Sequence, residues 1–198
     1  MQYGLIGWPL GHSISPQLHR RLAGVNYELH PLPEEQFDRF MREKDFAAVN
    51  VTIPYKRRVL PYCAQLTPAA QRCGSVNLLV KGTDGTLTGD NTDLAGLTFL
   101  LRQNGWTLSG ETVVILGSGG TGHTAKAAAE ELGAAEIAVV SRTGELNYEN
   151  LAERYGDRAF YLINTTPVGM APESGVSPLE LRAFPHCKGV ADVIYNPL

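Results

Sequence analysis

The sequence has 198 residues, of which 43% are hydrophobic and 19% charged, and its formal net charge at pH 7 is −3. This composition is typical of an ordinary globular protein, and the weak negative charge gives no indication of a nucleic-acid or membrane partner. The three cysteines have neither metal-binding nor disulfide-type spacing, so we expect reduced thiols in a cytoplasmic protein and no metal site. We also expect no signal peptide and no membrane-spanning segment.

Strand and helix patterns alternate along the first half of the chain. Three apolar runs have the length of buried strands: residues 3–7, 26–31 and 46–51. Ser15-Pro16 is a typical helix start with serine at the N-cap, and residues 34–43 place their apolar side chains on one helical face. This alternation favours a parallel α/β layer, to which residues 75–80 and 86–89 add a predicted hairpin.

The second half opens with a helical pattern, which we interpret as the link between two domains. Continuous apolar runs then predict a parallel sheet with strands at residues 112–116, 136–140, 159–163 and 189–194. An alanine-rich helix is expected over residues 124–132, and this is half of a doubly wound, Rossmann-like sheet. We therefore predict an α/β protein with two domains, residues 1–92 and 93–198, in which residues 93–104 form the linking helix.

A glycine-rich loop, Gly117-Ser118-Gly119-Gly120-Thr121, separates the first of these strands from its helix. Glycines at this point allow a tight turn and let backbone N–H groups approach a pyrophosphate at the helix N-terminus. The alternative is a strand-to-helix turn that binds nothing. The order of strand, loop and helix favours a dinucleotide site.

The end of the next strand indicates which dinucleotide is bound. A site that selects NAD places Asp or Glu there to bind the ribose 2′-hydroxyl, whereas this chain has Ser141-Arg142-Thr143. A guanidinium and two hydroxyls suit a 2′-phosphate, so NADP is favoured. The alternative is an ordinary surface arginine, and Glu145 lies close by in the sequence.

Candidate chemical groups are present in the first half of the chain. Lys56 ends the run Asn50–Lys56, and Asp93 follows the predicted hairpin, so that a proton-transferring lysine and a partner carboxylate are available. Ser13 and Ser15 could donate hydrogen bonds to a substrate carboxylate. The alternatives are a solvated lysine, an aspartate that favours a helix N-terminus, and a serine that is only a helix cap.

Eight segments, in order, resemble the signature segments of the shikimate dehydrogenase family: residues 12–16, 50–56, 74–77, 89–93, 117–120, 141–143, 164–170 and 192–197. The resemblance covers essentially the whole chain. It implies an oxidoreductase that reversibly reduces 3-dehydroshikimate to shikimate with NADPH, in chorismate and aromatic amino acid biosynthesis. It also implies a substrate-binding and catalytic domain in residues 1–92 and an NADP-binding domain in residues 93–198.

The resemblance implies a role for each matching residue. Lys56 and Asp93 correspond to the catalytic pair at the reacting hydroxyl. The substrate contacts comprise this pair together with Ser13, Ser15, Thr52, Asn77 and Tyr195. The cofactor contacts are Gly117, Ser118, Gly119, Gly120 and Thr121 at the pyrophosphate, Ser141, Arg142 and Thr143 at the 2′-phosphate, and Thr165 and Val193 beside the nucleotide.

The chemistry agrees with these residue types. Hydride transfer to a ketone leaves a developing alkoxide, which needs a proton donor or a positive charge nearby. Lys56 can supply both, Asp93 can orient the lysine and the hydroxyl, and the cofactor carries out the redox step.

Two alternatives remain open: a quinate/shikimate dehydrogenase that uses NAD, and a family member that binds nucleotide without turnover. We expect a monomer or a homodimer that acts on a small-molecule substrate. Relative to the family pattern, residues 143–164 are shortened, and the chain ends at Leu198 without the family's C-terminal return helices. We therefore expect exposed apolar surface on the first domain and tighter binding of NADP than of shikimate.

Overall fold

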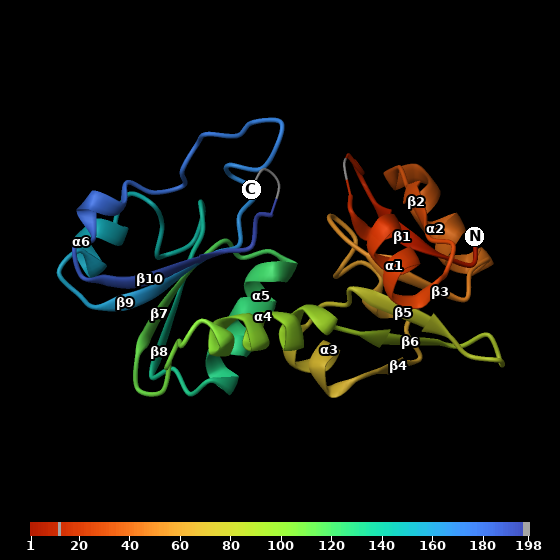
Figure 1. Ribbon diagram of the computed structural model, residues 1–198, viewed down its shortest axis with the longest axis horizontal. Helices are drawn as coiled ribbons and strands as arrows, with labels where there is room; N and C mark the ends of the chain where they lie inside the picture. The colour runs from red at the N-terminus through yellow and green to blue at the C-terminus, as the bar shows by residue number, and fades with distance from the viewer. Residues whose placement is uncertain (12, 196–198) are drawn as a thin grey trace. The chain divides into compact units, whose positions relative to one another are not determined.

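The computed structural model describes residues 1–11 and 13–195, so His12 and residues 196–198, which include the last two residues of the final signature segment, lie outside it. The chain divides into two compact units that join in the sequence at Thr92 and Asp93 (Figure 1). Each unit is built around one β-sheet. The predicted fold class, α/β with two sheets, is confirmed.

The first unit contains β1 (Tyr3–Gly7), α1 (Ser15–Ala23), β2 (Glu28–Pro31), α2 (Glu34–Glu43), β3 (Ala48–Val51), the 3-10 helix η1 (Leu60–Tyr62), β4 (Gln65–Leu66), α3 (Pro68–Cys73), β5 (Leu78–Lys81) and β6 (Leu87–Asp90). Its sheet has the order β2-β1-β3-β5-β6-β4. β1 runs parallel to both neighbours, as the alternation of strands and helices predicts. The hairpin then adds β5 antiparallel to β3 and to β6, so the complete sheet is mixed.

The core of the first unit forms around the amphipathic helix α2. Phe37 and Met41, one helical turn apart, are 1% and 0% exposed and share a buried cluster with the strands. Full burial of two such side chains stabilises a fold by about 3–6 kcal/mol. The ring of Phe37 stacks on Tyr55 with the centroids 4.4 Å apart. Because Tyr55 is fully buried, the backbone that carries its neighbour Lys56 is anchored to the core.

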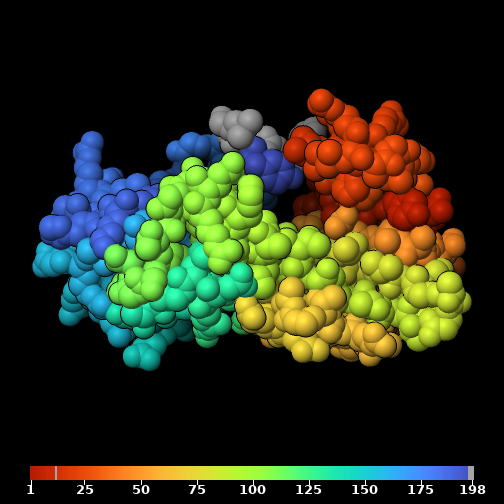
Figure 2. Space-filling model, turned by 60° about the horizontal axis from the view of Figure 1, so that its bottom comes forward, coloured from red at the N-terminus to blue at the C-terminus, as the bar shows by residue number. Residues whose placement is uncertain are grey.

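Helix α1 lies on the surface of the first unit, in the orange-red part of the chain in Figure 2. None of its residues is fully buried. Ile14, Leu18 and Leu22 follow one another at helical spacing and are 57%, 46% and 78% exposed. These three residues therefore form an exposed apolar row at helix α1.

The second unit contains α4 (Thr92–Gln103), which begins at the unit boundary, followed by β7 (Thr112–Leu116), α5 (Gly120–Glu131), β8 (Glu136–Val140), α6 (Leu151–Tyr155), β9 (Phe160–Asn164), the 3-10 helix η2 (Leu181–Ala183) and β10 (Cys187–Asp192). Its sheet is parallel throughout, in the order β10-β9-β7-β8 (Figure 1). Helix α5 packs on β7 and β8 through its alanines, of which Ala125 and Ala128 are fully buried. Small side chains let this helix approach the sheet closely.

Two local expectations were wrong, and two short elements were missed. The N-cap of α1 is Ile14 rather than Ser15, and it makes no side-chain capping bond. Helix α5 begins at Gly120, inside the glycine loop, rather than at residue 124. The short elements β4 and α3 were not predicted. Within the described residues, no helix is both long and apolar enough to cross a membrane.

Candidate active site

The predicted substrate residues of the first unit gather at one edge of its sheet. β1 and β3 are parallel neighbours, so Ser13 and Ser15, which follow β1, and Thr52 and Lys56, which follow β3, start from the same edge. Asn77 precedes β5, which runs antiparallel to β3, and so it also lies at that edge. The carboxyl ends of parallel strands are where α/β sheets collect ligands.

Ser13 and Ser15 bring two hydroxyl groups together. The Ser13 hydroxyl donates to the Ser15 hydroxyl, with the two oxygens 3.0 Å apart, and accepts a bond from the Ser15 backbone N–H at 3.2 Å. Both residues are half-buried. Because the Ser15 side chain does not cap α1, its hydroxyl can serve the site, as can the Ser13 hydroxyl. Two adjacent hydroxyls suit a carboxylate ligand.

The segment from Val51 to Lys56 is bonded at both ends to the residues around Asn77. The Val51 N–H donates to the Asn77 carbonyl at 2.8 Å, and the Val76 N–H donates to the Lys56 carbonyl at 2.7 Å. Lys56 is half-buried, in contrast to the exposed Arg57 beside it. The structure therefore holds the backbone of Lys56 close to that of Asn77, as a shared site requires.

The side chain of Asn77 is committed in part to the start of α4. Its Oδ1 accepts bonds from Thr92 N at 2.8 Å and from Thr92 Oγ1 at 3.3 Å, and its Nδ2 donates to Thr92 Oγ1 at 3.0 Å. The remaining capacity of the amide is its second N–H. Asp93 follows in the first turn of α4, where the helix dipole favours a carboxylate.

The glycine loop of the second unit has the geometry of a pyrophosphate cradle. Gly117 has a φ of 102°, which other residues rarely adopt. A Cβ on Gly122 would lie 2.2 Å from the Gly117 carbonyl oxygen, so the loop and the first turn of α5 touch through their backbones. The N-terminus of the 12-residue helix α5 thus opens from this loop, and it attracts a phosphate.

Ser141, Arg142 and Thr143 follow β8, the strand beside β7. The Ser141 N–H donates to the Leu146 carbonyl at 3.2 Å, which closes a turn that leaves Arg142 and Thr143 exposed. Arg142 lies near Tyr148: burial raises the pKa of Tyr148, and the guanidinium acts in the opposite direction. An exposed guanidinium at a strand end suits a 2′-phosphate.

Glu145, which weakened the sequence argument for NADP, is 3.9 Å from the guanidinium of Arg154 on α6. The Glu145 side chain is 94% exposed. An ion pair this exposed is weak, so Glu145 remains the carboxylate that the alternative of an NAD site would require.

Thr165 and Val193 follow β9 and β10, and they complete the carboxyl edge of the second sheet. The Thr165 hydroxyl donates to the Leu116 carbonyl at 2.6 Å, directly beside the glycine loop. The Val193 N–H donates to the Asn164 carbonyl at 3.2 Å. The predicted cofactor residues of the second unit therefore follow the four strands of one parallel sheet.

Asn164 and Asp192 were not recognised as site residues, although each begins a signature segment. Asn164 is 2% exposed, and its Nδ2 donates to both carboxylate oxygens of Asp192, at 3.2 and 3.1 Å. Its Oδ1 accepts bonds from Thr166. Together they fix the ends of β9 and β10. Tyr195, the remaining predicted substrate contact, is 55% exposed in the second unit, and its role stays a prediction.

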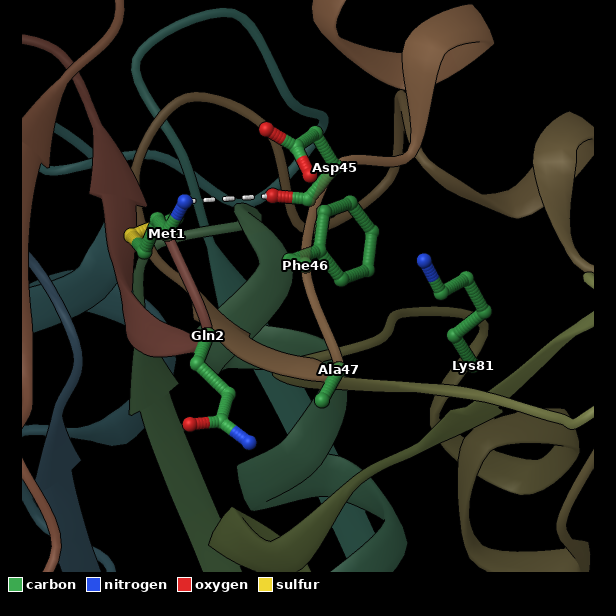
Figure 3. Close-up of a pocket in the computed structure, with 6 residues that line it drawn as sticks. All are labelled: Met1, Gln2, Asp45, Phe46, Ala47 and Lys81. Carbon is green, nitrogen blue, oxygen red and sulfur yellow. Dashed lines mark hydrogen bonds between the residues drawn. The ribbon is translucent and has the colours of Figure 1, made fainter.

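One surface hollow lies apart from these residues. It has a volume of about 330 Å³ and is lined by Met1, Gln2, Asp45, Phe46, Ala47 and Lys81 (Figure 3). The terminal ammonium donates to the Asp45 carbonyl at 3.3 Å across it. None of its lining residues is a predicted site residue, so the hollow is not the candidate site. No cluster of metal ligands was found in the described part of the chain.

A hydroxyl-lined sheet edge that carries a lysine in one unit, and a glycine cradle on a parallel sheet in the other, define a nucleotide-dependent oxidoreductase. The family model for the shikimate dehydrogenase substrate binding domain matches residues 5–79. The shikimate dehydrogenase (NADP(+)) of Oleidesulfovibrio alaskensis is 37% identical over 217 residues, which cover 98% of this chain and 76% of that protein. The chain belongs to the shikimate dehydrogenase family, as its signature segments predict.

Solved structures of shikimate dehydrogenases have the same fold as this chain. Shikimate dehydrogenase 1 from Peptoclostridium difficile superposes with a TM-score of 0.89 at 30% identity, covering 100% of this chain and 79% of that one. The shikimate 5-dehydrogenase of Thermus thermophilus, in complex with NADP(H) and shikimate, gives a TM-score of 0.79 at 33% identity, covering 100% of this chain and 80% of that one.

Proposed function

We propose that this protein catalyses the reversible, NADPH-dependent reduction of 3-dehydroshikimate to shikimate. The observation that carries the proposal is the sheet edge of the first unit, where two serine hydroxyls 3.0 Å apart accompany Asn77 and Lys56. Its support is that relatives with 33–37% identity are shikimate dehydrogenases (NADP(+)). The Thermus thermophilus structure contains both NADP(H) and shikimate.

In the proposed substrate complex, the Ser13 hydroxyl gives up its bond to Ser15, and the hydroxyls of both serines donate to the carboxylate. Thr52 and Asn77 bind ring hydroxyls. Lys56 lies at the carbonyl that is reduced. It donates a proton to the oxygen as negative charge develops, and its ammonium stabilises that charge. Asp93 orients the lysine and the reacting hydroxyl. Tyr195 is proposed as a further substrate contact.

In the proposed cofactor complex, Gly117 to Thr121 hold the pyrophosphate at the N-terminus of α5. Ser141, Arg142 and Thr143 bind the 2′-phosphate, and Thr165 and Val193 lie beside the nucleotide. When bound, NADPH supplies the hydride. The backbone contact between Gly117 and Gly122 supports this assignment, because it keeps the glycine loop close against the first turn of α5, where the pyrophosphate is proposed to bind.

The proposed division of labour follows the two units: residues 1–92 bind substrate and carry out proton transfer, residues 93–198 bind NADP, and residues 93–104 link them. We propose a monomer or a homodimer in the cytoplasm, and the three cysteines, which remain thiols, are compatible with a reducing compartment. Sedimentation of the purified protein and cell fractionation test these two points.

The decisive assay is oxidation of shikimate by the purified protein with NADP⁺, followed by the absorbance of NADPH. Quinate and NAD⁺ should be tested in the same experiment, in all four combinations. Turnover that is fastest with shikimate and NADP⁺ supports the proposal. Faster turnover of quinate with NAD⁺ would replace it with the quinate/shikimate alternative. Nucleotide binding without turnover of either acid would show a non-catalytic family member.

A further inference from the structure

A chain of polar and ring contacts crosses the first unit from helix α1 to Asn77. His19 on α1 stacks on Tyr27, Tyr27 bonds to Asn50 on β3, and Asn50 bonds to the Asn77 carbonyl. We propose that His19, Tyr27 and Asn50, here called the positioning network, set the distance between the carboxylate-binding serines and the hydroxyl-binding Asn77. This inference rests on the proposed function, because it concerns the same substrate site.

The centre of the positioning network is a buried tyrosine hydroxyl. Tyr27 is 7% exposed, and its hydroxyl donates to Asn50 Oδ1 at 2.7 Å. Burial raises the pKa of Tyr27, so the hydroxyl remains a neutral donor over the physiological range. Tyr27 precedes the edge strand β2, whereas Asn50 lies on β3, two strands away in the sheet. The bond therefore joins parts of the chain that the ladder of backbone bonds does not join directly.

The bond from Tyr27 also orients the amide of Asn50. With Oδ1 accepting from the tyrosine, Nδ2 points to the Asn77 carbonyl and donates to it at 3.2 Å. The same carbonyl accepts the Val51 N–H at 2.8 Å. Two donors thus fix the backbone at Asn77, whose side-chain amide is proposed to bind a substrate hydroxyl. Loss of the tyrosine hydroxyl would let the Asn50 amide rotate and weaken one of these donors.

At its other end, the positioning network reaches the serines. The ring of His19 stacks on Tyr27 with centroids 3.9 Å apart and planes within 15°. Its Nδ1 lies 2.8 Å from the Ser15 carbonyl, so this nitrogen carries the proton and donates. Because α1 has no fully buried residue, it has little apolar packing to fix its position. The stack and this bond hold its first turn, where Ser15 lies, against the sheet.

A purely structural role predicts lower stability and unchanged substrate binding, whereas a positioning role predicts weaker binding of shikimate with unchanged binding of NADP⁺. The key variant is Tyr27→Phe, which removes one oxygen and keeps the ring that stacks on His19. The matched control is Tyr62→Phe, which also removes one tyrosine hydroxyl bond in the first unit, to Asp38 at 2.7 Å. Tyr62 makes none of the contacts of the positioning network.

For Tyr27→Phe we expect a rise in KM for shikimate of about two- to tenfold, the factor that one neutral hydrogen bond is worth, with little change in kcat or in KM for NADP⁺. Tyr62→Phe should leave all three unchanged. His19→Phe, which can still stack but cannot donate to Ser15, should also raise KM for shikimate. Combining Tyr27→Phe with Asn50→Ala should add little to the effect of Asn50→Ala alone, because the hydroxyl acts through this amide.

The inference is overturned if Tyr27→Phe matches Tyr62→Phe in KM for shikimate, or if the losses in the double variant are additive. If Tyr27→Phe does not fold, His19→Phe and Asn50→Ala apply the same test. Failure of the proposed function has a different signature: the wild-type protein does not oxidise shikimate. In that case, crystal structures of the wild type and of Tyr27→Phe test the positioning network directly. If the Asn50 amide keeps its bond to the Asn77 carbonyl in Tyr27→Phe, the inference is overturned.

Discussion

Replacing Asn77 should separate two roles that meet in one side chain. Its Oδ1 accepts the Thr92 N–H at 2.8 Å and so satisfies a donor at the start of α4, whereas its second N–H is proposed to bind substrate. Asn77→Asp keeps an oxygen at the first position and removes the N–H groups. Asn77→Ala removes both. A comparison of the two variants therefore assigns each role to its own atom.

The structure sets the expected magnitudes. Asn77→Ala leaves the contacts to Thr92 unmade at a residue that is 7% exposed, and should lower the free energy of unfolding by about 1–3 kcal/mol. Asn77→Asp keeps the acceptor, and the N-terminus of α4 favours a carboxylate, so this variant should lose less of its free energy of unfolding than Asn77→Ala does. Both variants lose one donor to a neutral hydroxyl, worth about 0.5–1.5 kcal/mol, so kcat/KM for shikimate should fall about 2- to 10-fold in each.

Chemical denaturation gives the free energies of unfolding, and steady-state oxidation of shikimate gives kcat/KM, with KM for NADP⁺ as the internal control. Wild-type kcat/KM in Asn77→Asp would show that the amide does not donate to the substrate. If both variants lower the free energy of unfolding equally, the bond between the side-chain oxygen of residue 77 and the Thr92 N–H does not stabilise the fold.

Three further predictions test the remaining site and one exposed ion pair. Lys56→Ala should keep NADP⁺ binding, measured by calorimetry, and lower kcat by about 10²–10⁴. Adding Asp93→Asn should lower kcat little further, because both groups act on the same proton. An unchanged kcat in Lys56→Ala would remove Lys56 from the mechanism. Arg142→Ala should raise KM for NADP⁺ about 10- to 100-fold and leave KM for NAD⁺ unchanged, since only NADP⁺ carries the 2′-phosphate; equal losses would mean a structural role. The hydrogen bond from Arg158, followed by those from Tyr155 and Thr112, lowers the pKa of Glu136 in the folded state. The stability that ionised Glu136 contributes is therefore complete above the ordinary carboxyl pKa of about 4.3, and it is lost as the pH falls through the lower folded-state pKa. Glu136→Gln should therefore lower Tm by about 2–4 °C at pH 7 and have no effect near pH 2 in scanning fluorimetry, and a pH-independent effect would contradict this.

Elements with periodic apolar patterns were predicted to the residue. The strands β1, β7 and β8 and the helix α2 have the expected bounds, because each buries a continuous or one-sided set of apolar side chains. In α2 this set includes Phe37 and Met41, which the structure buries completely or nearly so. Apolar side chains must leave water, so their spacing along the sequence follows the buried face of the element. The sequence was therefore sufficient to predict these elements.

Local sequence signals were less reliable where tertiary contacts compete with them. The glycine loop was expected to precede the alanine-rich helix, but α5 already begins at Gly120, and its first turn packs through Gly122 against the carbonyl of Gly117. α3 was missed although Thr67-Pro68 is a start signal: Thr67 caps the helix by accepting from Ala70 N at 3.2 Å. Its six residues are too few to show a helical apolar period.

What sequence could not predict is the set of long-range polar bonds beneath the site. The signature segments indicate which residues belong to the site, but Asn164 and Asp192 bond across 28 positions, and Tyr27 and Asn50 across 23. Such bonds depend on the order of the strands in the sheet, which the spacing of apolar residues does not define. A buried asparagine left without its partner destabilises the fold, so these bonds are strongly specified once the sheets form. Asn164 bonds to the carboxylate of Asp192, and Asn50 bonds to the backbone carbonyl of Asn77. Both asparagines thus fix the ends of the strands from which the proposed cofactor and substrate contacts arise.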